Sequence, residues 1–183
     1  MSVSDNEPPM PSAAGPENGD GTGEDLEYKR ALLRAMNLLA VRMHSAYQLR
    51  TKLARKFSRE VIEKVLHRLE EINLLDDLEF AREYVRQRVA RSPRAPALLI
   101  KELRSRGVCG ENAAGAVEET LSETGLTEQE LACQATRKRI TTLSGESDPR
   151  KREKLFRFLS SRGFQASIAR LAIEEILGDF EDD

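Results

Sequence analysis

Apolar residues recur at helical spacing along nearly the whole chain from Leu26 onward. Stripes such as Ala46, Leu49, Leu53 and Phe57 place apolar side chains three or four residues apart, which is typical of helices that bury one face. Capping residues and helix breakers divide this pattern into segments. It predicts nine helices, at about 26–43, 45–57, 58–72, 76–91, 96–107, 111–122, 127–143, 149–163 and 164–177.

Local signals fix several of the predicted ends. Ser45 with Gln48 and Thr127 with Glu130 have the spacing of a capping box, in which two side chains satisfy free backbone N–H groups. Asp148 is expected to cap the eighth helix because a proline follows it. The predicted stops of the fifth, eighth and ninth helices are glycines, namely Gly107, Gly163 and Gly178.

A short signature recurs where each predicted second helix meets a third. A leucine and a basic residue precede Phe57, and a similar run with an added glycine precedes Val108 and Phe164. The spacing indicates repeats of about fifty residues, each too small to bury its own apolar face alone. We therefore predict an all-α fold of three tandem, helix-turn-helix-like repeats with small shared cores, at 25–74, 75–124 and 125–178.

The charge of the chain is unevenly distributed. Residues 1–24 are rich in proline, glycine, serine and acid, so we expect a disordered acidic tail there, and residues 179–183 form a second acidic tail. Residues 1–25 and 178–183 together hold ten acids and no lysine or arginine, which leaves 29 bases against 21 acids between them. A basic folded part favours an acidic surface or a nucleic acid as partner.

The excess of positive charge lies on the predicted second helices. Residues 45–57 carry four bases and no acid, and the second helices of the other two repeats are also strongly basic. Repeats stacked in register would align the three helices into one basic band, although a solvated face with accidental bias remains the alternative. The candidate binding residues are Arg50, Lys52, Arg55, Lys56, Arg82, Arg86, Arg94, Lys101, Arg104, Arg106, Arg150, Lys151, Arg152, Lys154 and Arg157.

Residues suited to catalysis do not form a recognisable set. His44 and His67 have the spacing of surface or packing residues, and Cys109 and Cys133 make neither a disulfide framework nor a metal site. We expect no enzyme activity, no metal and no cofactor. Since there is no long apolar run or secretory signal, we expect a cytoplasmic protein without a membrane segment, acting as a monomer.

Residues 74–86 carry the most specific motif in the chain. An apolar pair and two aspartates precede a helix with an aromatic residue, an alanine and a second aromatic residue, here Asp76, Asp77, Phe80, Ala81 and Tyr84. This motif resembles that of the RecX family, and so do the helix pair before it and the arginine–glycine turns at 106–107 and 162–163. The resemblance covers about residues 28–177.

Membership of that family implies an elongated, curved array of three-helix repeats that binds RecA filaments on single-stranded DNA. It also implies lower ATP hydrolysis, less strand exchange and less cleavage of the SOS repressor. The five motif residues are interpreted as structural, with Asp76 as a helix cap. Two departures are visible: the glycine expected before Phe57 is absent, and Asn73 stands where a glycine is common.

A sequence-nonspecific DNA-binding module without a RecA partner is the alternative function. Three-helix units with a basic second helix overlap with helix-turn-helix patterns. The second helices offer mainly arginine and lysine, which favours contact with phosphates over reading of bases. Weak direct binding to DNA is therefore compatible with both functions.

Overall fold

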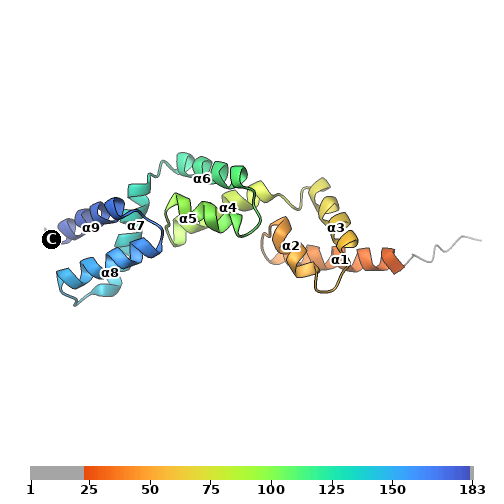
Figure 1. Ribbon diagram of the computed structural model, residues 1–183, viewed down its shortest axis with the longest axis horizontal. Helices are drawn as coiled ribbons and strands as arrows, with labels where there is room; N and C mark the ends of the chain where they lie inside the picture. The colour runs from red at the N-terminus through yellow and green to blue at the C-terminus, as the bar shows by residue number, and fades with distance from the viewer. Residues whose placement is uncertain (1–22, 182–183) are drawn as a thin grey trace, which may run out of the picture.

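The computed structural model describes residues 23–181, which form an elongated arch of helices (Figure 1). The described part contains no strand, and its helices group in threes along the chain, so the predicted all-α repeat fold is confirmed. The helices are α1 Gly23–Val41, α2 Ala46–Leu53, α3 Arg59–Glu71, α4 Asp77–Arg91, α5 Pro96–Arg104, α6 Gly110–Thr124, α7 Glu128–Ile140, η1 Thr141–Leu143, α8 Asp148–Ser161 and α9 Ala166–Glu181.

Within each repeat the first and third helices pack against each other, and the second helix closes the bundle. The pairs are α1 with α3, α4 with α6, and α7 with α9. In Figure 1 the second helices α2, α5 and α8 lie along the lower, concave edge of the arch, whereas α3, α6 and α9 lie above them. The basic helices of the sequence therefore share one edge.

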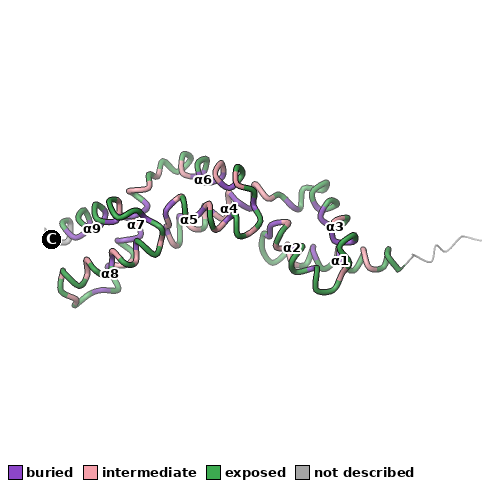
Figure 2. The backbone as a smooth tube through the Cα atoms, viewed as in Figure 1, coloured by how far each residue is buried: buried purple, intermediate pink, exposed green. Residues whose placement is uncertain are grey.

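Burial divides the molecule into two cores (Figure 2). Leu49, Leu53 and Leu69 are fully buried within the first repeat and belong to a core of that repeat alone. The second and third repeats share a continuous core that includes Leu103 and Leu159. The expectation that all neighbouring repeats share a core is thus wrong for the first junction, where the two cores are separate.

Each junction uses the start of one second helix and the turn that follows the next. Ser45 Oγ donates a hydrogen bond of 2.6 Å to the carbonyl of Arg106, and the backbone N–H of Ala95 donates one of 3.0 Å to the carbonyl of Arg162. At the first junction the N–H of Ala46 also donates to Asp77 Oδ1 at 2.8 Å. The two junctions therefore repeat one docking arrangement.

The first repeat has no glycine before Phe57, whereas the other two repeats have one at the equivalent place, and this docking arrangement accounts for the difference. Gly107 and Gly163 have positive φ angles of 87° and 84°, and each lies against the preceding repeat. In the second repeat the N–H of Val108 reaches the Leu103 carbonyl, five residues back, whereas that of Phe57 reaches Leu53, four back. The first turn is one residue shorter because no repeat precedes it in the described chain.

Several predicted helix ends need correction. The second helix ends at Leu53 rather than 57 because the N–H of Phe57 bonds the Leu53 carbonyl and closes a turn there. The N-cap of α8 is Ser147, so Asp148 is not the cap but lies in the first turn, where it pairs with Lys151 at 3.0 Å. Helix α9 continues through Gly178 to Glu181, because an isolated glycine costs a helix only about 1 kcal/mol.

The first helix begins before the predicted position. Gly23 and Glu24, which we expected in the disordered tail of residues 1–24, are helical, and Glu24 forms an ion pair with Lys64 of α3. Residues 1–22 and 182–183 lie outside the described residues, and so does most of the expected N-terminal tail.

Candidate functional site

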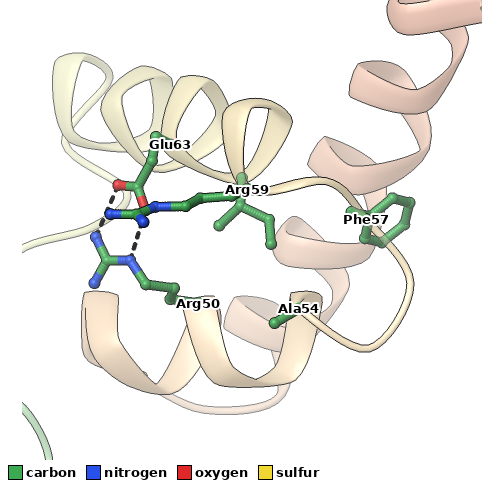
Figure 3. A pocket seen from close by; sticks show the side chains of 6 residues that line it. Arg50, Ala54, Phe57, Arg59 and Glu63 are labelled. Atoms are coloured by element: carbon green, nitrogen blue, oxygen red, sulfur yellow. Dashed lines mark hydrogen bonds and ion pairs between the residues drawn. The ribbon is translucent and has the colours of Figure 1, made fainter.

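Eight of the fifteen candidate basic residues form ion pairs within the protein. Arg50 illustrates them: its Nε and Nη2 donate to the two carboxylate oxygens of Glu63 at 2.7 and 2.8 Å, across a cleft between α2 and α3 (Figure 3). Phe57 and Ala54 also line that cleft. This hydrogen-bonded pair raises the pKa of Arg50 and lowers the pKa of Glu63. The charge of Arg50 is thus balanced internally.

In the third repeat, most of the candidate basic side chains also form ion pairs with acidic side chains of the same protein. Lys151 pairs with Asp148, and Arg152, Lys154 and Arg157 pair with Glu174, Glu146 and Glu153. Arg150 is exposed and forms no ion pair among residues 23–181, but its charge adds to the effect of Lys154, which lowers the pKa of Glu146. Most of these pairs are at least partly exposed and contribute little to stability, yet they leave little free charge on α8.

Besides Arg150 of α8, five of the candidates are exposed and form no ion pair among residues 23–181. They are Lys52 of α2, Arg55 and Lys56 in the turn after it, and Lys101 and Arg104 of α5. The structure therefore concentrates the unbalanced charge of the predicted band on the first two repeats. Arg82 and Arg86 of α4 lie outside this group because they pair with Glu119 and Glu79, the first of which belongs to α6.

Sequence reasoning missed a cluster at the first junction. Tyr84 lies between two guanidinium groups, those of Arg88 and Arg106, whose Cζ atoms are 5.0 and 4.5 Å from its ring centroid. The Tyr84 hydroxyl donates to Glu102 at 2.5 Å, and Glu102 also pairs with Arg94. The Glu102 carboxylate, whose side chain is 16% exposed, also lies 3.7 Å from Arg88 Nε, whereas Arg106 donates to the Glu102 backbone carbonyl.

The second junction repeats the cluster with different partners. Arg139 and Arg162 lie over the ring of Phe158, with their Cζ atoms 5.6 and 4.8 Å from its centroid. Burial lowers the pKa of Arg162, and the positive charge of Arg88 lowers it further. Burial is also the first cause of the lowered pKa of Arg94, followed by the charge of Arg88. The junctions therefore hold partly desolvated arginines.

A sequence signal for these clusters was present. The first helices of the second and third repeats both end in basic residues, Arg88 and Arg91 in α4 and Arg137, Lys138 and Arg139 in α7. Such residues are common at helix C-termini because they interact well with the helix dipole, so they did not stand out. Only the fold shows that they meet the turn residues Arg106 and Arg162.

Comparison with known families decides the identity of the fold and its repeats. The models of the first, second and third RecX three-helix domains match residues 31–69, 76–117 and 127–173. The chain belongs to the RecX family.

Relatives of known sequence and structure agree. A regulatory protein RecX from Prosthecochloris aestuarii is 39% identical over 157 residues, which cover 84% of this chain and 97% of that one. One from Amycolatopsis mediterranei is 33% identical, covering 84% and 86%. The crystal structure of RecX from Lactobacillus salivarius has a TM-score of 0.62 at 22% identity, covering 81% of this chain and 96% of that one.

The motif residues of this RecX chain lie at the first junction. Asp76 caps α4 by accepting from the N–H groups of Leu78 and Glu79 at 2.8 and 3.0 Å. Phe80 is 5% exposed and Ala81 is fully buried, whereas Tyr84 is only partly buried. Asn73, with a φ of 54°, takes the left-handed conformation that its place in the sequence suggested.

Two further observations concern the class of protein. None of the helices in residues 23–181 combines the length and apolar character needed to cross a bilayer. The same residues contain no group of three His, Cys, Asp or Glu side chains placed to hold a metal ion.

Proposed function

We propose that this RecX chain regulates the recombinase RecA by binding RecA filaments on single-stranded DNA. Its effect is to lower ATP hydrolysis, strand exchange and repressor cleavage. Family membership supports RecA as the partner, since the relatives are regulatory proteins named RecX. The binding surface is the concave edge of the arch, through the basic band predicted from the sequence.

The observation that carries this surface is the set of five exposed side chains without ion pairs on the first two repeats. Keeping like charges close together costs free energy unless a partner of opposite charge balances them. An acidic protein surface or exposed phosphate would provide that balance. We expect Lys52, Arg55 and Lys56 to contribute most, because no acid lies among residues 45–57.

Titration of RecA-dependent ATP hydrolysis on single-stranded DNA tests the proposal. The chain should lower the rate in a saturable way, and the inhibition should weaken as salt rises because exposed charges are screened. An unchanged rate at every ratio of this chain to RecA would refute regulation of ATP hydrolysis.

Sequence-nonspecific DNA binding without RecA is the second candidate function. The same five exposed bases favour it, because lysine and arginine contact phosphates without reading bases. Filter binding of labelled single-stranded DNA, with and without RecA, separates the two. Retention of DNA at similar concentrations in both conditions supports the second candidate, whereas strong dependence on RecA supports the first.

A further inference from the structure

The two junction clusters occupy equivalent positions but differ in one residue. Arg88 and Arg139 each lie twelve residues after the N-cap of their helix. In the turns that follow the second helices, Arg106 lies three residues after Leu103, and Arg162 lies three residues after Leu159. Glu102, the residue before Leu103, provides the carboxylate of the first cluster. The equivalent residue before Leu159 is Phe158, so the second cluster has no carboxylate at that position.

A groove of about 190 Å³ opens at this second cluster. Its basic lining residues are Arg91 from the end of α4, Lys138 and Arg139 from α7, and Arg162 from the turn after α8. Ser92 and Thr142 add hydroxyl groups, and the described residues that line the groove include no acid. Four positive charges thus surround a space into which none of the described residues places a negative charge.

Two arginines of the groove are held in positions that are unfavourable in free energy. The Nε atom of Arg139 is buried without a hydrogen-bond partner among residues 23–181. Arg162 donates to Ser92 Oγ, and its own carbonyl accepts from the Ala95 N–H, so both its ends are fixed. Partly buried charges without a counterion are unfavourable. An anion entering the groove would recover that loss.

We propose that the groove between the second and third repeats binds a backbone phosphate of single-stranded DNA. A guanidinium presents a planar pair of N–H groups that matches phosphate oxygens, and three such groups lie here beside the ammonium of Lys138. The site differs from the five unpaired residues of α2 and α5, and it requires no RecA.

The neighbouring groove favours a nucleic acid over a small free anion. Arg91 also lines a groove of about 730 Å³ at the first junction, together with Arg42, Arg88 and Arg106. The acids of that groove, Glu79 and Glu83, are themselves paired with Arg86. Two basic grooves that share Arg91 suit a polymer with a charge on every unit, such as a DNA strand.

Fluorescence anisotropy of labelled oligothymidylate, with the full chain and no RecA, tests this site. The double variant Arg91→Gln and Lys138→Gln removes two exposed charges and the hydrogen bond of 2.5 Å from Lys138 Nζ to the Ala90 carbonyl, so circular dichroism is used to check that the fold is kept. This variant should weaken binding about tenfold and reduce the salt dependence of log Kd by about 0.7, the value for one phosphate contact on a single strand. An unchanged affinity and an unchanged salt dependence would overturn the site.

A matched control is available in the same repeat. Arg137→Gln with Arg157→Gln also removes two exposed charges, but these residues pair with Glu175 and Glu153 and lie outside the groove. This control should bind DNA like the parent. If it weakens binding as much as the groove variant does, the effect is one of net charge and the site is rejected.

A second variant supplies the missing counterion. Phe158→Glu places a carboxylate at the position of Glu102, so it should neutralise the cluster and weaken DNA binding although no base is removed. Polyglutamate at equal ionic strength should compete poorly with the oligonucleotide. Competition as strong as that of unlabelled DNA would mean that the groove accepts any polyanion, which would overturn the assignment to phosphate. RecA is absent throughout, so failure here leaves RecA regulation standing.

Discussion

Gly163 lies against Leu98 of the preceding repeat so closely that an added Cβ would stand 2.8 Å from the Leu98 Cβ. Its φ of 84° would be strained for any residue with a side chain. The contact brings the turn after α8 onto the first turns of α5, where the Ala95 N–H bonds the Arg162 carbonyl. One glycine thus sets how the second and third repeats meet.

Gly163→Ala should destabilise this junction by about 1–3 kcal/mol, from backbone strain and from the overlap with Leu98. Urea unfolding followed by circular dichroism measures the change. Gly115→Ala is the matched control, because Gly115 lies within α6 and an added Cβ would meet no atom within 4 Å. That control should be stabilised by about 0.5–1 kcal/mol. Equal effects of the two substitutions would contradict the tight contact.

Much of the fold could be read from the sequence because its signals are local. Apolar periodicity and the caps Asp76 and Thr127 depend on residues within one or two turns, and both caps are made as their spacing predicts. The length of α2 depended instead on the turn closed by Phe57. The absent glycine before Phe57 accompanies a turn with no preceding repeat among the described residues, and no local pattern reports such a contact.

A partly buried carboxylate, that of Asp77, predicts a pH dependence at the first junction. Burial raises the pKa of Asp77, although its hydrogen bond from the Ala46 N–H opposes the shift. An acid whose pKa is raised in the folded state makes the protein less stable as pH rises through that range. Asp77→Asn keeps an oxygen acceptor but cannot ionise. Its stability relative to the parent should therefore increase as pH rises from about 4 upward.

Urea unfolding of the parent and of Asp77→Asn at several pH values checks this. Other carboxylates, such as Glu63 with its lowered pKa, affect both proteins equally and cancel in the difference. A difference in stability that stays constant across the pH range would contradict a raised pKa for Asp77.

The two cysteines should react at very different rates. Burial, reinforced by a hydrogen bond to Glu175 at 3.2 Å, raises the pKa of the Cys133 thiol to about 11. At pH 8 only about one such thiol in a thousand is ionised, and the thiolate is the reactive form. Cys109 is exposed. Iodoacetamide should modify Cys109 alone in the native protein, and both thiols in urea; rapid native modification of Cys133 would contradict its burial.

The candidate site was harder to predict than the fold. Composition located the basic second helices, but it could not show that Arg152 and Lys154 face Glu174 and Glu146. Ion pairs between helices depend on which faces meet, and the sequence does not report that. The clusters around Tyr84 and Phe158 went unnoticed for the same reason, since their arginines come from separate helices and turns.

The last prediction concerns the proposed RecA-binding surface. Lys52→Gln, Arg55→Gln and Lys56→Gln together remove three exposed charges that have no ion pair among the described residues. The fold should survive, because these side chains lie off the buried stripe that contains Leu49 and Leu53. At about 0.2–1 kcal/mol for each exposed contact, the concentration for half-inhibition of RecA ATP hydrolysis should rise about tenfold.

The same number of charges removed from α8 provides the decisive contrast. Arg152, Lys154 and Arg157 are already balanced by acids of this chain, so their replacement by glutamine frees carboxylates but removes little available positive charge. That variant should inhibit RecA nearly as well as the parent at moderate salt. If it fails while the variant of the first repeat inhibits normally, the third repeat makes the main contact. If both inhibit like the parent and both remain folded, the basic band does not bind the filament.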